Sequence, residues 1–528
     1  MPAPAPTAFH RGQRRTLLVF ALLLASFLLY APSLGSDFVW DDRDAATAFG
    51  TARNPLVAEL RPLADYLTGN WWPQRNPSAE TYRPLTTWLF ALRHALCGDH
   101  AMVAHLLSVL LHTLGIGLVF RLLRELGAGF AAAWLGAAVF GAHALHGEAV
   151  LTIVGQAELL ALVFGLLGTL AALRALRSTR PAPWWGATTL AFTAACFSKE
   201  SAVGWTVIAP LCVFAAQRTH RRTTSRAGWL GLGAAVALPA TLFLLLRARM
   251  LATLPRDELG YAFLDNPLAH VDTFARVASG LVAWGHGLLL TLAPLRLAIE
   301  YGPGQLPIVT RADEPWCLAA AAASIAVAAF TWQALQIRRA PLRALAAALF
   351  VTFTLPISNV FALVFMRFAE RAYLTPTLAA ALFAAWALQR ARTPTARRTT
   401  WAIAGAWLLL SAGLSCQRIF VWRDDRTIIE HGVTESPGSL RMQLCAGALA
   451  NRDGDAVRAR HHFERAAAID PASPQAWCEL ANLDLRAGNR DGAAQALAKA
   501  NAGRPREVAR HRAEIDAIAA RLAAAAPR

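Results

Sequence analysis

Charged residues are scarce in this chain. Lys, Arg, Asp and Glu make up 16% of its 528 residues, while 55% of the residues are hydrophobic. About a quarter of the residues in a soluble globular protein are charged. The apolar residues also come in long blocks, a pattern typical of proteins with several membrane-spanning helices. The sequence therefore predicts an all-α, polytopic membrane protein.

The sequence lacks the patterns of a nucleic-acid-binding surface and of a disulfide or zinc site. The formal charge of +17 comes largely from Arg clusters between apolar runs, and no basic patch is interleaved with aromatic residues, so we expect no nucleic-acid partner. The seven cysteines form no CxxC pair and no metal-ligand spacing. We interpret them as small buried residues and predict neither a disulfide framework nor a zinc site.

Eleven apolar segments are predicted to span the membrane. Several are shorter than the ~20 residues that an upright helix needs, so those helices should border polar cavities or continue into structured loops. We interpret the first as an uncleaved helix and not as a signal peptide. The segments are 17–34, 101–120, 129–144, 157–174, 184–198, 202–217, 227–246, 317–335, 344–362, 373–388 and 401–416.

Arginine clusters set the expected topology. With the N-terminus in the cytoplasm, all five predicted cytoplasmic turns are Arg-rich, as the positive-inside rule requires. The outer loops, including 35–100 and 247–316, and the C-terminal tail then face outward. Residues 277–292 would reverse this pattern if they spanned, so we predict an interfacial or re-entrant helix there. The Ala- and Arg-rich composition favours a bacterial inner membrane with the tail in the periplasm.

The tail after residue 416 is polar, Ala-rich and repetitive. Pro437, Pro471 and Pro505 are 34 residues apart, and Gly454 recurs as Gly488. This period predicts an α-solenoid of about two tetratricopeptide repeats. Because two repeats are few for a stable solenoid, the tail should lean on a cap helix at 511–522 or on the membrane domain. The predicted parts are a membrane domain, 1–417, a linker, 418–436, and a repeat tail, 437–528.

Acidic residues follow the first predicted span directly. Asp41 and Asp42 lie close to a membrane exit, where carboxylates are costly and often functional. The alternative is that they cap the next helix or lie solvated in the loop. In the second outer loop, His143 and His146 precede Glu148, and a polar substrate wall or helix cap is expected there before a metal site. Glu148 should lie near the two aspartates if the first and third spans are neighbours.

Basic residues also occur at predicted outer ends. Lys199 precedes Glu200 at a tight tip, where it could form a structural ion pair or hold a lipid phosphate. Arg367 and Arg371 flank Glu370 in another outer loop and break the local positive-inside pattern. Either they meet an anionic ligand or they form ion pairs.

These features fit one chemistry. An enzyme that moves a sugar from a polyprenyl phosphate needs a base for the acceptor hydroxyl, cations for the departing phosphate and an opening to lipid. The acids after the first span, the basic outer ends and the long interfacial loop could supply all three.

Six motifs in chain order, together with the repeats, resemble the transmembrane and tetratricopeptide-repeat O-mannosyltransferases, within the GT-C glycosyltransferases. The resemblance covers nearly the whole chain. The motifs are Asp37-Phe-Val-Trp-Asp-Asp42, Arg83-Pro-Leu85, the loop from His143 to Val150 with Gly155-Gln-Ala-Glu-Leu-Leu160, Phe197-Ser-Lys-Glu200, Asp265-Asn-Pro267, and Pro356-Ile-Ser-Asn-Val360 followed by Ala369-Glu-Arg371. The chain departs from the family pattern at Ala144, Gln156 and Ala372–Pro376.

The resemblance implies a GT-C fold, a polyprenyl-phosphate mannose donor, a protein acceptor and inversion at the sugar carbon. Asp41 would be the base and Asp42 would hold acceptor or donor, although the order could be reversed. The other candidate substrate-binding residues are Arg83, Glu148, Lys199, Glu370 and Arg371. No cofactor beyond the lipid-linked donor is predicted, and a divalent metal is left open. The main alternative is a non-catalytic membrane scaffold that presents the repeats to a partner; a transporter is less expected, because neither charges within helices nor symmetry between halves is present.

Overall fold

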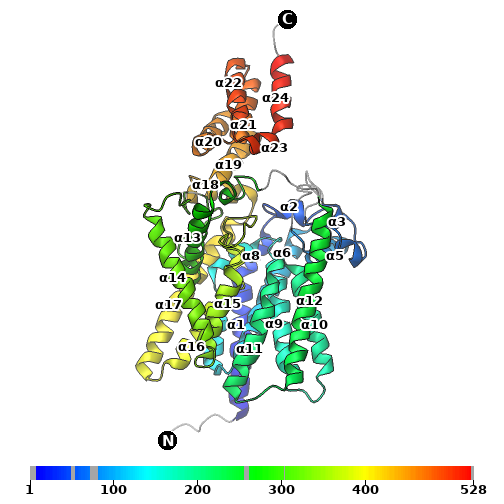
Figure 1. The fold of residues 1–528 in the computed structure, drawn as a ribbon, viewed down its shortest axis with the longest axis vertical. Coiled ribbons are helices and arrows are strands. Elements are labelled where there is room, and N and C mark those ends of the chain that lie inside the picture. The colour runs from blue at the N-terminus through cyan, green and yellow to red at the C-terminus, as the bar shows by residue number, and fades with distance from the viewer. Residues whose placement is uncertain (1–7, 49–53, 72–80, 255–260, 303, 525–528) are drawn as a thin grey trace.

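The computed structural model describes residues 8–48, 54–71, 81–254, 261–302 and 304–524 (Figure 1). Within these residues the fold is all-α, as predicted, without a strand. Its helices up to the repeats are α1 Ala8–Tyr30, η1 Ala31–Gly35, α2 Asp42–Ala45, α3 Pro55–Ala58, α4 Leu63–Tyr66, α5 Pro84–Cys97, α6 Ala101–Glu125, α7 Phe130–Gly141, η2 Ala144–His146, α8 Gly147–Leu151, α9 Gln156–Ala175, α10 Ala182–Ser198, η3 Glu200–Gly204, α11 Trp205–His220, α12 Arg226–Thr253, η4 Pro267–His270, α13 Thr273–Leu292, α14 Trp316–Leu335, α15 Pro341–Thr354, η5 Glu370–Tyr373, α16 Leu378–Arg390 and α17 Pro394–Val421.

Each of the eleven predicted spans overlaps one long helix of the bundle. Among the described residues, seven helices are long and apolar enough to cross a membrane, and α7, α15 and α16 are shorter apolar helices. The number of crossings therefore stays a prediction. The segment 344–362 was predicted too long, because α15 ends at Thr354. Pro356 lacks an amide hydrogen and restricts the residue before it, which favours this end.

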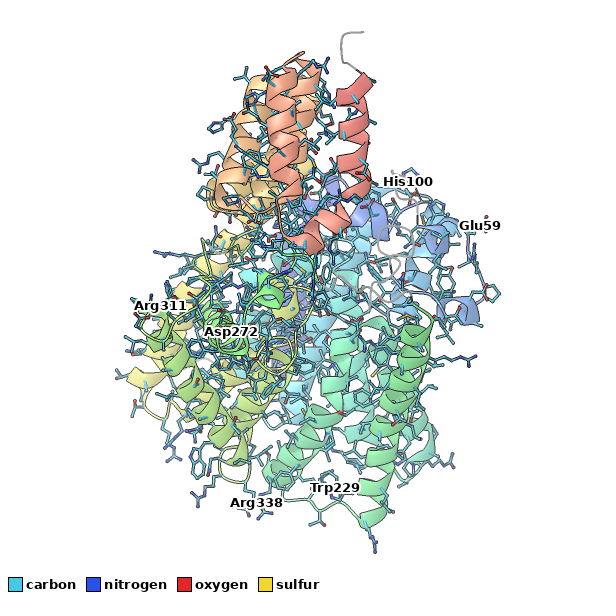
Figure 2. The ribbon with its side chains drawn as sticks, turned by 45° about the horizontal axis from the view of Figure 1, so that its top comes forward. Glu59, His100, Trp229, Asp272, Arg311 and Arg338 are labelled. Carbon is cyan, nitrogen blue, oxygen red and sulfur yellow. The ribbon has the colours of Figure 1, made fainter. Side chains whose placement is uncertain are left out.

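The Arg-rich turns lie together at one end of the bundle. Arg177, after α9, contacts Glu125 at the end of α6, and His220 at the end of α11 lies 2.9 Å from the Glu125 carbonyl oxygen. Gln389 of α16 donates to the carbonyl of Gly127 at 3.1 Å. Arg338, after α14, lies at the same end, opposite the repeats (Figure 2). The predicted alternation of the helices is therefore consistent within the fold.

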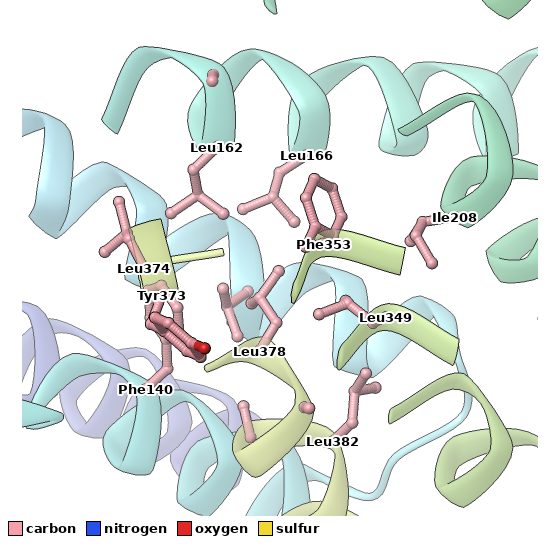
Figure 3. Packing of buried hydrophobic residues seen from close by; sticks show 14 of the residues in the cluster. Phe140, Leu162, Leu166, Ile208, Leu349, Phe353, Tyr373, Leu374, Leu378 and Leu382 are labelled. Atoms are coloured by element: carbon pink, nitrogen blue, oxygen red, sulfur yellow. The ribbon is translucent and has the colours of Figure 1, made fainter. Parts of the chain in front are cut away.

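Apolar side chains from most helices of the bundle form one core, with α9, α15 and α16 among its contributors. Leu162 of α9, Leu349 of α15 and Leu378 of α16 are buried in one cluster (Figure 3). Gly165 permits the close approach of α9 and α11, because a Cβ atom there would lie 2.1 Å from the Trp205 ring. Close packing of this kind gives the outer loops a rigid base.

The helix α13 contains the residues 277–292 that we predicted to be interfacial or re-entrant. It packs against α14 and η5, and Asp272 caps it by accepting a hydrogen bond from the Ala275 amide at 2.8 Å. Although α13 has 20 residues, it is not among the helices apolar enough to span. Figure 1 places it near the end of the bundle that carries the repeats. Its interfacial or re-entrant role stays a prediction.

The C-terminal helices form two helical hairpins and a cap. Gly454 and Gly488 have φ values of +81° and +75° in the mid-repeat turns, where glycine is favoured. The predicted cap is α24, which packs on α21 and α22. The tail also contacts the membrane domain, because Arg441 lies 2.7 Å from Asp265. The predicted linker contains a helix of its own. These elements are α18 Asp425–Glu435, α19 Leu440–Arg452, α20 Ala456–Ile469, α21 Pro474–Arg486, α22 Arg490–Asn501, α23 Pro505–Arg510 and α24 Arg512–Ala524.

Candidate active site

Arg371 joins two of the predicted acids at the end of the bundle nearest the repeats. Its Nη1 lies 3.2 Å from Glu148 Oε1 and 3.8 Å from Asp41 Oδ2. The Arg371 backbone amide also donates to Glu148 Oε2 at 2.8 Å. These residues come from η5, α8 and the segment before α2. The first and third predicted spans, α1 and α7, are in contact, which was the condition given for Glu148 to lie near the aspartates. The fold therefore brings together three residues that are distant in the sequence.

The backbone before Asp41 is held in an unusual conformation. Trp40 has a φ of +54°, which costs a residue with a large side chain about 1–3 kcal/mol. Its amide donates to Asp425 Oδ1 of α18 at 2.8 Å, which stabilises this conformation. The strained residue and its partner fix the direction in which the Asp41 side chain leaves the backbone. No pattern in the sequence pointed to Asp425.

The side chain of Asp42 lies in a different environment from that of Asp41. Its side chain is fully buried, its Oδ1 accepts from the Val154 amide at 2.9 Å, and its Oδ2 accepts from the Val39 amide at 3.2 Å. Burial raises the pKa of Asp42 to about 7, although these hydrogen bonds oppose the rise. Oδ1 therefore connects outer loop one to outer loop two, and Oδ2 holds the turn within outer loop one. The Asp41 side chain, in contrast, is 17% exposed.

Lys199 and Glu200 do not pair with each other. Lys199 contacts Glu158, at the start of α9. Glu200 lies 3.2 Å from Arg83 Nε and accepts from the Tyr82 amide at 3.0 Å. Burial and the positive charges of Arg83 and Arg371 lower the pKa of Lys199. Three cations therefore lie close together, and Glu158 is the partner that the sequence did not identify.

Glu370 lies on the other side of η5. It is 1% exposed, and its Oε1 accepts hydrogen bonds from Tyr301 Oη at 2.6 Å and the Ala298 amide at 2.8 Å. Arg418 Nη2 lies 3.4 Å from its second oxygen. Burial raises the pKa of Glu370 to about 7. Its contacts hold η5 in place, and thereby the adjacent Arg371.

A cleft of about 900 Å³ lies beside these residues. Arg83, Lys199 and Arg371 line the cleft. Asp41 is not among the lining residues, but it pairs with Arg371, which is. Among the described residues, the lining contains seven cations and two carboxylates; the cations are Arg83, Lys199, Arg247, Arg367, Arg371, Arg506 and Arg510, and the carboxylates are Glu200 and Asp265. The electrostatics of the cleft therefore favour an anion.

Arg367 is the most unusual of these cations. It is 4% exposed, and its Nη2 donates to the Pro307 carbonyl at 2.6 Å. Its Nε and Nη1 have no hydrogen-bond partner among the described residues. Burial lowers its pKa to about 10, so the guanidinium stays charged at neutral pH. A buried cation with unused donors on the wall of a cleft favours an anionic ligand.

The histidines of outer loop two form a buried chain of contacts. His112 Nε2 lies 3.0 Å from His146 Nδ1, and His146 Nε2 lies 2.7 Å from Thr377 Oγ1. His143 Nδ1 accepts from the Leu145 amide at 3.3 Å and so caps η2, as one alternative predicted. No group of three or more His, Cys, Asp or Glu residues in the described part of the chain could hold a metal ion.

Comparisons with known proteins agree with the resemblance seen in the sequence. The family described as dolichyl-phosphate-mannose-protein mannosyltransferase matches residues 77–245, and the tetratricopeptide repeat matches residues 450–515. The first match includes Arg83, Glu148 and Lys199. The second falls within the predicted tail.

Several curated proteins similar to this chain are named protein O-mannosyl-transferases. The protein O-mannosyl-transferase Tmtc2 of Drosophila melanogaster is 31% identical over 311 residues, 57% of this chain and 32% of the fly protein. The protein O-mannosyl-transferase F38B6.6 of Caenorhabditis elegans is 25% identical over 484 residues, 90% of this chain and 65% of the worm protein. Mouse TMTC4 is 25% identical over 470 residues, 80% of this chain and 62% of its own length. The chain spans less than two thirds of each relative. The predicted resemblance is confirmed.

Proposed function

We propose that this chain, similar over most of its length to protein O-mannosyl-transferases, is a membrane glycosyltransferase. It would move mannose from a polyprenyl-phosphate donor to a hydroxyl group of a protein acceptor. One observation carries the proposal: Arg371, held by Asp41 and Glu148, lies on the wall of a cleft that is rich in cations. A scaffold has no need of this arrangement.

The donor phosphate would bind to the cations of the cleft. Arg367 has two unused donors, and Lys199 and Arg371 line the same space. A phosphate there would satisfy the buried guanidinium and neutralise part of the local positive charge. Because charge builds up on the phosphate as the sugar departs, the same cations would stabilise the transition state.

The lipid tail would follow the apolar part of the wall. Leu251 and Leu254, near the end of α12, face the same cleft as Leu363 and Phe365. Phe361, in the same loop, is 73% exposed, so apolar surface continues from the cleft to the outside of the bundle. A polyprenyl chain could leave the cleft there for the bilayer without crossing a polar wall.

Asp41 would act as the base. Its carboxylate removes the proton of the acceptor hydroxyl as the oxygen bonds to the anomeric carbon, while the bond from that carbon to the phosphate oxygen breaks. The electron pair leaves with the polyprenyl phosphate, and the sugar carbon inverts. Arg371 orients Asp41 and lies between this carboxylate and the cleft. Asp42 and Glu370 position the loops and do not contact substrate, and we propose no step through a metal ion.

The proposal also assigns a role to each part of the chain and an orientation in the membrane. Residues 1–417 would do the chemistry and residues 437–528 would hold the acceptor. The Arg-rich turns favour the cytoplasm for the N-terminus, and the repeats then lie on the periplasmic side of a bacterial inner membrane.

The test uses the full chain in lipid nanodiscs with radiolabelled polyprenyl-phosphate mannose and a periplasmic protein extract. Label should pass into protein, and the Asp41→Asn variant should transfer almost none while remaining folded. Arg311→Gln is a matched control, because Arg311 is exposed and pairs locally with Asp313. Donor that remains unused by folded wild-type protein, together with co-purification of a repeat-bound partner, would favour the scaffold.

A further inference from the structure

The short helix α23 belongs to the repeat tail but forms part of the cleft. Arg506 and Arg510 line the same cavity as Lys199 and Arg371 of the membrane domain. They are four residues apart, so they lie on one face of the helix. Figure 1 shows α23 at the base of the repeats, next to the end of the bundle. The repeat tail is therefore a wall of the cleft and not only its neighbour.

Contacts on both sides hold α23 in place. The amide of Phe263, in the large outer loop, donates to Glu507 Oε1 at 3.1 Å. The guanidinium of Arg504 lies 3.9 Å from the centre of the Phe263 ring and pairs with Asp470 at 2.7 Å. Val508 is buried in the repeat core. These contacts of Arg504, Glu507 and Val508 hold the backbone of α23 against the large outer loop and the repeat core, so Arg506 and Arg510 are carried on an anchored helix.

Two of the cations that line the cleft, Arg506 and Arg510, belong to the repeat tail and not to the membrane domain. The two carboxylates among the described lining residues each pair with another arginine, Glu200 with Arg83 at 3.2 Å and Asp265 with Arg441 at 2.7 Å. A polyprenyl-phosphate donor carries one phosphate, which the cations of the membrane domain would bind. The two arginines of α23 come from a domain type that binds peptides. They therefore suit an anionic group on the acceptor.

We propose that Arg506 and Arg510 form an acceptor subsite that binds a carboxylate side chain close to the hydroxyl to be glycosylated. The inference rests on the proposed function and adds to it a preference for acidic acceptor segments. The repeat tail then selects the acceptor with the same residues that complete the cleft, so recognition and chemistry share one cavity.

The experiment measures binding directly, with the full-length protein in nanodiscs made of a neutral phospholipid. Two fluorescent peptides of equal length alternate Ser with Glu or Ser with Gln, and fluorescence anisotropy gives their affinities. The Glu peptide should bind more tightly by roughly threefold to thirtyfold, the range of two partly exposed ion pairs. In the double variant Arg506→Glu, Arg510→Glu this preference should disappear, and a matching Ser-Lys peptide should gain affinity.

The matched control is the double variant Arg458→Glu, Arg512→Glu. It makes the same change of charge on the repeat tail, at exposed residues that do not line the cleft. It should keep the preference for the Glu peptide, with thermal melting of both variants confirming that the tail is folded. Equal loss in both double variants would overturn the proposal, because general charge would then explain the binding.

A vesicle-binding experiment distinguishes an acceptor carboxylate from the other possible anionic ligand, a phospholipid headgroup. If the charge reversal at α23 leaves peptide binding unchanged but weakens the binding of the protein to vesicles with an anionic phospholipid, the arginines serve a headgroup and the proposal is wrong. Peptide selection by α23 without any sugar transfer would refute the proposed function and leave the subsite intact. Sugar transfer at the same rate to acidic and neutral acceptors would refute the subsite and leave the proposed function intact.

Discussion

Asn266 donates a hydrogen bond from its Nδ2 to Asn359 Oδ1 at 2.8 Å. The two residues come from the two family motifs in the large outer loop and after α15, and both are fully buried. Asn359 Oδ1 also accepts from the Val364 amide at 3.0 Å, and its φ is +63°. The pair therefore ties together the loop that carries Arg367, and the two asparagines shape the wall of the cleft through their own hydrogen bonds.

This pair gives a prediction for stability and for donor binding. Asn359→Ala removes the shared acceptor and puts Ala in the left-handed region, so stability should fall by about 2–4 kcal/mol and the donor KM should rise. Asn359→Gly keeps the backbone freedom and should be less harmful by about 1 kcal/mol. Melting temperature and donor titration measure both effects. Identical losses in the two variants would show that the backbone conformation is not important.

Substitutions of the three neighbouring aspartates should separate chemistry from support. Asp41→Asn keeps the shape and removes the base, so kcat should fall roughly 10²–10⁴-fold while donor binding persists. Asp42→Asn should lower stability more than turnover, because both its oxygens accept from backbone amides. Asp44→Asn serves as the control in the same loop and should change little. Full activity in the Asp41 variant would exclude it as the base.

The raised pKa of Asp42 predicts how stability depends on pH. The folded pKa of about 7 lies above the unfolded value of about 4, so the folded protein keeps this proton over a wider range. The contribution of this carboxyl is complete below about pH 4 and is lost as the pH rises through about 7. Melting temperatures of wild type and Asp42→Asn between pH 4 and 8 measure it by difference. The gap between the two proteins should change with pH, and a constant gap would contradict the assignment.

Arg367 should reveal its role through opposite effects on stability and binding. Arg367→Gln removes a buried charge with unused donors, so the melting temperature should stay level or rise. The donor affinity should fall by roughly 10- to 100-fold, the loss expected for a hydrogen-bonded charge. Arg311→Gln, at an exposed position, should change neither quantity. A lower melting temperature with unchanged donor affinity would make Arg367 a structural residue only.

A reporter fusion tests the orientation. An enzyme that is active only in the periplasm, fused after residue 528, should be active, whereas one fused after residue 180 should not. The turn at 177 lies at the end of the bundle opposite the repeats and contacts Glu125 there. If the fusion after residue 528 is inactive, and a reporter that works only in the cytoplasm is active at the same position, residues 277–292 span the membrane.

The sequence predicted features that depend on local patterns. Apolar blocks predicted the helices, and the 34-residue period predicted the repeats, because burial in lipid or in a solenoid imposes these patterns on every turn. Asp41, Glu148 and Arg371, three of the predicted site residues, lie together, and their roles stay predictions. The burial of Asp42 and Glu370 was not predicted, because a carboxylate bound to backbone amides looks the same in the sequence as a catalytic one. The partners Glu158 and Asp425 were missed for a related reason: the contacts cross long stretches of chain.

The cleft is built from segments that are far apart in the order of synthesis. Its wall begins with Trp71 and includes Arg510. Because chains are made from the N-terminus and fold domain by domain, the cations of the membrane domain exist before α23 does. A newly made chain can therefore present an open, positively charged cavity that has no acceptor wall. If the proposed function and the acceptor subsite are correct, the docking of α23 onto Phe263 completes the selective site. A defect in the final repeat would then release a protein that binds donor but does not discriminate among acceptors.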